Sequence, residues 1–292
     1  MSTSCEQKIN GDGHTNADIG IDTVSDSLAN ASISDDDDKL FQDPPPKREC
    51  PICMLPIPYS FGACGVQTIY MACCGKTVCF GCMLAAAEEV KKGNIKKWCP
   101  FCRMPMDFTD KEMTKRVKKR LKLNDADAVY ELGRRYHDGG STLQSDMRKS
   151  LELWIKAAEL GSVEARFSLA NMYNSGEGVE EDIEKCIYYM KLAAMGGHEE
   201  ARYKLGRLEY KKCNFDYVNG NMDIEYNKGI VKRAMKHFII GARSGYDDSL
   251  KCVGAGYKSG YVTKDEYASA LRAYQSIRNE MKSKQRTEAE HS

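Results

Sequence analysis

Eight cysteines arranged as four close pairs constrain the fold of this chain more than any other feature of its sequence. Thiolates bind Zn²⁺ tetrahedrally, and a C-x-x-C turn places two sulfurs on one metal ion. Four pairs therefore supply two closed four-sulfur sites, a spacing not expected of merely buried or disulfide-bonded cysteines. The pairs are Cys50/Cys53, Cys73/Cys74, Cys79/Cys82 and Cys99/Cys102.

Length and composition limit the class of protein. The 292 residues exceed what one compact core usually needs, so we expect two domains. The chain lacks an apolar run near the ~18 residues of a membrane helix, and its start lacks the apolar region of a secretory signal. Thirteen cysteines without an export signal indicate a reducing compartment. We expect a cytoplasmic or nuclear protein with no membrane partner.

The first 47 residues are acidic and poor in large apolar side chains. They contain ten acidic and three basic residues, including the run from Asp35 to Asp38. Such a segment buries too little surface to offset its ordering entropy, so residues 1–47 are predicted to be disordered. Pro44-Pro45-Pro46 is predicted to form a stiff, extended spacer. The acidic run is interpreted as solvating, with a docking role as the alternative.

Residues 48–106 are predicted to form the zinc module. Its one helix is expected at Leu84 to Lys92, where good helix formers precede Gly93. A basic helical linker is predicted at 107–123. Its apolar stripe, at i, i+4 and i+8, is formed by Met113, Val117 and Leu121.

The basic linker carries seven Lys or Arg between positions 111 and 122. A solvated surface is the simplest interpretation of this charge. A nuclear-import signal, contact with RNA phosphates and pairing with the acidic N-terminus remain open.

An internal repeat runs from residue 124 to 283. Successive Leu or Val markers are offset by 37, 36 and 48 residues, and an Ala-Ala-x-x-Gly-like marker repeats with offsets of 36 and 48. Helical hairpins repeated near 36 residues predict an α-solenoid. The longer interval predicts an exposed insertion at 213–227, and residues 284–292 are expected to be a disordered tail. The Leu and Val markers are Leu132, Leu169, Leu205 and Val253.

The cysteine pattern C-x2-C-x19-C-C-x4-C-x2-C-x16-C-x2-C resembles the RING finger in an all-cysteine variant. The opening Cys50-Pro51-Ile52-Cys53 and the closing Cys99-Pro100-Phe101-Cys102-Arg103 carry the resemblance, which covers about 55 residues. The common form has a His near Lys76, whereas this chain has Cys73 and Cys74 as the third and fourth ligands.

The resemblance implies interleaved ligands and two structural Zn2+ ions. One ion would be held by Cys50, Cys53, Cys79 and Cys82. The other would be held by Cys73, Cys74, Cys99 and Cys102. With four protein sulfurs on each ion, neither has a position for water or substrate. Cys64 remains an alternative to Cys73.

The repeats resemble Sel-one-like repeats, relatives of tetratricopeptide repeats. The stretch from Ala165 to Gly197 carries this resemblance, and the third and fourth copies are degenerate. Together the two resemblances imply a mainly α protein: a small zinc-bound RING finger followed by an α-solenoid of helical hairpins, with a disordered N-terminus.

The RING resemblance implies an E3 ubiquitin ligase that binds a ubiquitin-conjugating enzyme and ubiquitin, while the repeats recruit a protein substrate or adaptor. Such a ligase holds the ubiquitin thioester of the conjugating enzyme in a reactive arrangement, which reduces the entropic part of the barrier. Ile52, Leu84 and Pro100 would form the shallow docking groove, and Arg103 would bridge the conjugating enzyme and ubiquitin. Ala85-Ala86-Ala87 stands where many active members carry a Trp. Internal packing for Ile52 and a solvated surface for Arg103 are the alternatives.

The sequence contains no phosphate-binding loop, H-E-x-x-H motif or nucleophile elbow. The rival to a ligase is therefore a non-catalytic zinc scaffold that assembles other proteins. A nucleic-acid-binding zinc protein is the third hypothesis, supported only by the basic linker, and nucleic acid is not the expected partner.

Overall fold

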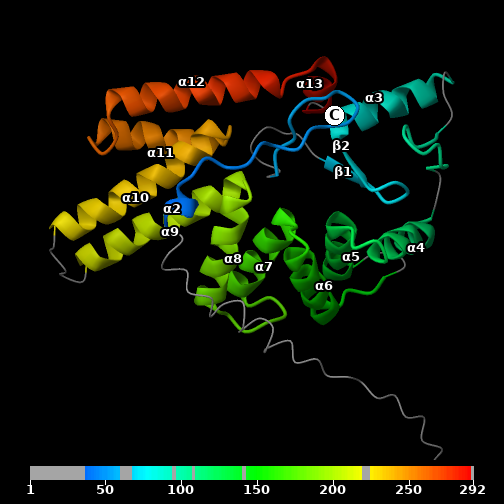
Figure 1. Ribbon diagram of the computed structural model, residues 1–292, viewed down its shortest axis with the longest axis horizontal. Coiled ribbons are helices and arrows are strands. Elements are labelled where there is room, and N and C mark those ends of the chain that lie inside the picture. The colour runs from blue at the N-terminus through cyan, green and yellow to red at the C-terminus, as the bar shows by residue number, and fades with distance from the viewer. Residues whose placement is uncertain are drawn as a thin grey trace, which may run out of the picture. The chain divides into compact units, whose positions relative to one another are not determined.

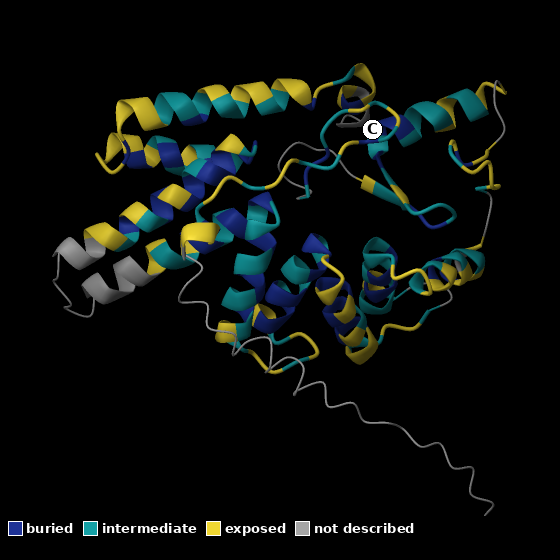
Figure 2. Ribbon diagram, viewed as in Figure 1, coloured by how far each residue is buried: buried dark blue, intermediate teal, exposed yellow. Residues whose placement is uncertain are grey.

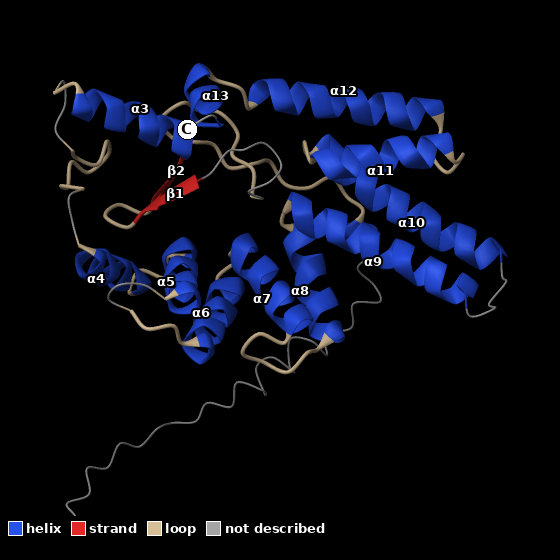
Figure 3. Cartoon of the chain, turned by 180° about the vertical axis from the view of Figure 1, so that it is seen from behind, coloured by secondary structure: helices blue, strands red, loops and turns tan. Residues whose placement is uncertain are grey.

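The computed structural model describes residues 37–59, 68–93, 97–106, 109–139, 143–218 and 224–290. The protein is mainly helical, as predicted, with one two-stranded sheet in this part of the chain (Figures 1 and 3). The elements before the repeats are α2 (Asp37–Leu40), β1 (Thr68–Met71), β2 (Lys76–Cys79), α3 (Phe80–Lys91) and α4 (Asp110–Leu121).

Four helical hairpins follow, and their starting positions reproduce the predicted spacing of the repeats. The first helices of the hairpins begin at residues 126, 163, 199 and 247. The hairpins are α5 (Ala126–Asp138) with α6 (Met147–Glu159), α7 (Val163–Ser175) with α8 (Ile183–Met195), α9 (Glu199–Val218) with α10 (Ile224–Arg243), and α11 (Asp247–Lys258) with α12 (Lys264–Glu280). The extra residues of the third interval lengthen α9 and α10, and positions 219–223 of the predicted insertion lie outside the described residues.

The repeat markers are core residues, as predicted. All four Leu and Val markers have exposed fractions of 4% or less, and Figure 2 shows buried positions where the paired helices face each other. Glycine permits the closest approach between helices. A Cβ placed on Gly133 would lie 2.5 Å from Cδ1 of Trp154, and one on Gly206 would lie 2.7 Å from Cε1 of Phe238.

Side chains at the helix starts satisfy backbone N–H groups that have no partner within the helix. The predicted N-caps Asp146 and Asp182 accept hydrogen bonds from the N–H groups of Lys149 (3.0 Å) and Lys185 (2.9 Å). His198 begins α9 in a similar way, because its Nδ1 lies 3.3 Å from the N–H of Ala201.

The zinc module is built around the β1–β2 hairpin. The strands are antiparallel, with Thr68 paired to Cys79 and Met71 to Lys76. Helix α3 begins directly after β2, four residues before the predicted start at Leu84, so that Cys82 lies in its first turn. Helix α4 lies within the predicted linker 107–123, and its apolar stripe packs as expected, with Val117 fully buried.

Two terminal segments differ from the prediction of disorder. Residues 37–47 are ordered, and Leu40 is 2% exposed, because this segment is held against the repeats. Residues 284–290 form helix α13 (Lys284–Glu290) beside α3 (Figure 1), where Arg286 is 3% exposed. The rest of the predicted N-terminal disordered segment, 1–36, lies outside the described residues.

The zinc module shares its core with the repeats. One cluster joins Ile57 and Val78 of the module to Tyr246 and Met281 of the last hairpin. A second cluster joins Ala72, in the β1–β2 turn, to α4 and α5. Residues on both sides of the predicted boundary at 106 therefore contribute to common hydrophobic clusters. No helix of the described ranges is long and apolar enough to cross a membrane.

Candidate metal centres

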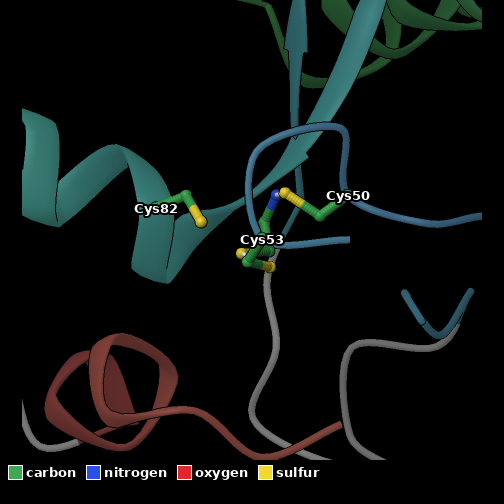
Figure 4. A group of neighbouring side chains, drawn as sticks. Cys50, Cys53 and Cys82 are labelled. Carbon is green, nitrogen blue, oxygen red and sulfur yellow. Dashed lines mark hydrogen bonds between the residues drawn. The ribbon is translucent and has the colours of Figure 1, made fainter. Parts of the chain in front are cut away.

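The structure brings the eight paired cysteines into the two interleaved groups that the RING resemblance implies. Within each group, all four sulfur atoms lie within 4.8 Å of one another. Figure 4 shows the first group, where Cys50 and Cys53 come from one loop and Cys82 from α3. The members are Cys50, Cys53, Cys79 and Cys82 in the first group, and Cys73, Cys74, Cys99 and Cys102 in the second.

The sulfur spacing fits tetrahedral zinc. With Zn–S bonds of about 2.3 Å, two sulfurs on one ion lie about 3.8 Å apart. The sulfurs of Cys53 and Cys79 are 3.9 Å apart, and those of Cys74 and Cys99 are 3.7 Å apart. Each group can hold one Zn²⁺ with protein sulfurs only, which is the chemistry of a structural site. Cys64 lies outside the described residues, so its alternative role stays open.

Two loops of the same construction supply four of the eight sulfurs. In the first loop, the N–H of Met54 donates to the carbonyl of Cys50, and an isolated bridge pairs Glu49 with Pro56. The second loop repeats both contacts 49 positions later, with Arg103 donating to Cys99 and Trp98 paired with Pro105. Each metal group therefore contains one rigid turn that holds its two sulfurs in fixed positions.

The equivalent residues Met54 and Arg103 both adopt left-handed backbone conformations, with φ of 57° and 56°. This conformation is uncommon for residues other than glycine, and it persists where the surrounding structure determines it. The turn geometry thus fixes the backbone from which the Arg103 side chain projects. The three C-x-x-C motifs predicted turns at their cysteines, but their spacing does not indicate that the loops at Cys50 and Cys99 share one backbone conformation.

Backbone N–H groups favour the thiolate at the first cysteine of each loop. Burial alone would raise the pKa of Cys50, but N–H donors from Cys79, Cys53 and Ile52 lower that pKa to about 7. At Cys99, burial is likewise outweighed by N–H donors from Cys102 and Phe101, so the pKa is lowered. Each loop is thereby prepared to present a deprotonated sulfur to a cation.

Arg286 supplies a positive charge beside the first metal group. Its guanidinium donates to the sulfur of Cys53 at 3.5 Å and to the carbonyls of Leu55 (3.1 Å) and Pro56 (2.8 Å). Four thiolates on one Zn²⁺ carry a net charge of −2, which a buried guanidinium partly offsets. Arg286 was not predicted to lie at this site, because it belongs to the predicted tail 284–292 and is 233 positions from Cys53 along the chain.

The residues that the resemblance assigns to partner binding are accessible at the loops. Ile52 is 41% exposed, Pro100 and Arg103 are exposed, and Leu84 on α3 is half-buried. Further apolar side chains of the two loops are also exposed. These are Met54 (64%), Trp98 (46%) and Met104 (44%).

The basic helix α4 uses part of its charge within the protein. Arg116 donates to the carbonyl of Pro105 at 3.1 Å, and Arg120 donates to Asp125 at 2.6 Å. The hydroxyl of Tyr70, on β1, donates to the same Asp125 carboxylate at 2.9 Å. Two of the seven basic side chains thus help to hold the zinc module, α4 and α5 together.

Comparison with known proteins identifies the repeats. A family model for the Sel1 repeat matches residues 126–162 and 163–198. These are the α5–α6 and α7–α8 hairpins with their connections, whose first-helix starts are 37 residues apart. No curated protein matches the chain.

Two solved structures are similar to part of this chain. A Sel1 repeat protein from Oxalobacter formigenes is 22% identical, with 66% of this chain and 71% of that chain covered and a TM-score of 0.45. The protective antigen c5321 from uropathogenic Escherichia coli, displaying an SLR fold, is 26% identical, with 58% of this chain and 33% of that chain covered and a TM-score of 0.44. From the family match and the hairpin geometry together, residues 126–198 of this chain form two Sel1 repeats, which are the first two of its four helical hairpins.

Proposed function

We propose that this protein is a RING-type E3 ubiquitin ligase whose zinc module binds a charged ubiquitin-conjugating enzyme and whose repeats recruit a second protein. The main support is the pair of interleaved four-cysteine groups, with Ile52, Pro100 and Arg103 accessible on the loops that these groups hold. A closed metal site performs no chemistry on a substrate, so a module of this kind acts through its surface.

In this proposal the module accelerates ubiquitin transfer by positioning. Ile52 and Pro100 offer apolar contact to the conjugating enzyme. The half-buried side chain of Leu84, on α3, extends this apolar surface. Arg103 presents a planar fork of donors that can engage two partners at once. Zinc contributes folding free energy, roughly 10–16 kcal/mol for a structural site. Holding the thioester and the incoming amine in one arrangement removes part of the entropic barrier.

Ubiquitin discharge tests the proposal directly. Purified full-length protein is incubated with a panel of conjugating enzymes carrying ubiquitin as thioesters, and the loss of thioester to free lysine is followed with time. We expect discharge to accelerate with at least one conjugating enzyme. Cys99→Ser, which removes a ligand of the second group, should abolish the acceleration, whereas Cys252→Ser in α11 should not. Absence of acceleration with every conjugating enzyme would overturn the ligase proposal.

The alternative is a non-catalytic zinc scaffold. It is favoured by Ala85-Ala86-Ala87, where active RING modules often carry a Trp, and by the core that the module shares with the last hairpin. In a scaffold, the metal groups would fix the module against the repeats, and both would present one surface to partners. Such a protein would bind two zinc ions and its partners while leaving thioester discharge at the background rate.

A further inference from the structure

A segment of the chain itself lies across the repeats. Residues 40–48, here called the strap, run from α2 toward the zinc module (Figures 1 and 3). Along the strap, successive contacts fall on the third, second and first hairpins, so its direction is opposite to the order of the repeats. The strap therefore contacts three successive hairpins.

The strap begins with one buried anchor. Leu40 is 2% exposed, and its carbonyl accepts a hydrogen bond from Arg202 of α9. A second N–H of the same guanidinium donates to the carbonyl of Ala194, at the end of α8, at 2.8 Å. Arg202 is itself 2% exposed. A buried guanidinium that binds the carbonyl at the end of α2 recognises main chain, whatever side chains the segment carries.

An aromatic side chain follows the buried leucine. The ring of Phe41 lies 4.8 Å from the ring of His237 on α10. Two cations of the same helix, Arg233 and Lys236, each lie 5.1 Å from the centre of the Phe41 ring. Cations at this distance from an aromatic face are attracted by its quadrupole. This part of the surface therefore favours an aromatic residue.

Proline follows in the middle of the strap. A Cβ placed on Gly197, in the turn between α8 and α9, would lie 3.7 Å from Cβ of Pro44 and 3.8 Å from Cδ of Pro45. Gly197 has φ of 97°, a conformation that glycine adopts without strain. Consecutive prolines keep the chain extended and carry no N–H donors that would need partners.

At the end of the strap, two basic residues form ion pairs with three acidic residues of the repeats. Lys47 pairs with Glu199, and Arg48 pairs with Glu164 and, at 2.9 Å, with Asp127. Asp127 and Glu164 are the second residues of α5 and α7, and Glu199 is the first residue of α9. Acids at helix starts are favoured by the helix dipole. Here the stacking of three repeats aligns them into one row that two adjacent basic residues can follow.

Four of the nine strap residues are exposed to solvent. Leu40 is its one buried residue, while Gln42, Asp43, Pro45 and Pro46 are exposed. Its contacts include the ion pairs of Lys47 and Arg48, the aromatic and cation contacts of Phe41, and the buried side chain and hydrogen-bonded carbonyl of Leu40. A segment whose contacts are separated by solvent-exposed residues opens more readily than the helices beneath it.

We propose that this surface is the partner-binding site of the repeats and that the strap is its intramolecular occupant. The ligand class is a protein segment with an apolar-aromatic pair at the end of a helical turn, then extended prolines, then two adjacent basic residues. The strap competes with such a segment from another protein. This inference rests on the part of the proposed function in which the repeats recruit a protein, and it does not depend on ligase activity.

Direct binding of a strap peptide tests the proposal. The probe is a fluorescein-labelled synthetic peptide of residues 38–49, followed by fluorescence anisotropy with the full-length protein. An attached segment has an effective concentration near the millimolar range, so the wild-type chain should bind the probe weakly. The full-length variant Phe41→Ser/Lys47→Glu/Arg48→Glu, whose own strap is disabled, should bind the probe at least tenfold more tightly. Adding Glu164→Arg to that variant should abolish the gain.

Three comparisons make the result decisive. A probe carrying Lys47→Glu and Arg48→Glu should not bind, and a full-length Lys156→Glu variant, altered on the exposed face of α6, should bind like the wild type. If circular dichroism shows that the triple variant is unfolded, Arg48→Gln alone is measured, with a gain of about threefold expected. Equal affinity of wild type and strap-disabled variant, or equal binding of the charge-reversed probe, would overturn the proposal. Because the readout is binding, ubiquitin discharge can succeed or fail independently.

Discussion

The guanidinium of Arg286 lies 3.5 Å from the sulfur of Cys53, although 233 positions separate the two residues. The same side chain donates to the carbonyl of Met281 at 2.9 Å, as well as to carbonyls of the first cysteine loop. Its backbone also lies close to α3, since a Cβ placed on Gly81 would be 2.8 Å from the backbone nitrogen of Arg286. Helix α13 thus covers the first metal group from outside.

Replacing Arg286 should weaken zinc retention at the first group. Arg286→Gln removes a charge-assisted donor to sulfur and leaves buried carbonyls without partners, at a cost of about 2–4 kcal/mol. When a chromogenic chelator is added to the folded protein, we expect one of the two zinc ions, that of the first group, to leave faster than in the wild type. Lys282→Gln, an exposed change in the connection between α12 and α13, is the matched control. Equal release rates in the two variants would show that α13 packs beside the site without stabilising it.

The metal content should be two zinc ions per chain. Elemental analysis of the purified protein checks this number. Cys53→Ser should lower it, whereas Cys186→Ser should not, because Cys186 is a buried residue of α8 outside both groups.

Loss of the first zinc ion should also increase hydrogen exchange in the last hairpin. We expect this because Tyr246 and Met281 of that hairpin pack in the same core as the first metal group. Unchanged exchange there would mean that the shared core does not depend on the metal.

Docking and positioning should separate in the zinc module. Ile52→Ala should weaken binding of the conjugating enzyme with zinc content unchanged. Arg103→Ala should leave binding within about twofold and reduce discharge about tenfold, equivalent to about 1.4 kcal/mol in the barrier. Met54→Ala is the control, because Met54 has the same left-handed backbone in the equivalent loop. A similar loss of discharge in Met54→Ala would assign the Arg103 effect to turn geometry.

Acid should destabilise the repeats through His198. Burial, and secondarily the positive charges of Lys204 and Lys47, lowers the pKa of His198 to about 3. The unfolded chain titrates near 6.5, so below that pH the unfolded state binds more protons. Stability should therefore fall as pH drops from 6.5 toward 3, by about 1 kcal/mol between pH 7 and 5.5 for this group.

Urea unfolding of the zinc-loaded protein at the two pH values measures this difference. His198→Asn keeps a side chain that can cap α9 but removes the titrating group, and it should flatten the pH dependence. Zinc content is determined in each sample, since thiolates also bind protons in acid. If the unfolding free energy of His198→Asn depends on pH as steeply as that of the wild type, the acid sensitivity belongs to other groups.

The parts predicted well from the sequence are those set by local geometry. A C-x-x-C turn determines where two sulfurs lie, so four pairs predicted two four-sulfur sites, and the RING resemblance implied which pairs share a site, as the two groups confirm. The repeat period followed from small residues such as Gly133, which must meet a large one such as Trp154 in the next helix. Both patterns depend on neighbours within about 50 residues, so they can be read without knowing the tertiary arrangement.

The strap and α13 could not be predicted because their partners are distant. Residues 37–47 have the composition of a disordered segment, and what orders them is the row of acids that three stacked repeats create. The sequence of α13, KQRTEAE, lacks an apolar face, and it is held largely by the single side chain of Arg286. The composition of a segment indicates how much surface the segment can bury by itself. It does not indicate whether the rest of the folded chain provides a site that holds the segment.

The contact between Arg286 and Cys53 also sets an order of events during synthesis. Chains emerge N-terminus first at about 5–20 residues per second, so roughly 10–40 s pass between the appearance of Cys102 and that of Arg286. During this interval all eight cysteines are available to the cellular zinc supply, while the segment that covers the first group does not yet exist. A ribosome stalled within α12 would therefore carry a zinc module that can load and unload its first ion freely, and release of the finished chain would end that exchange.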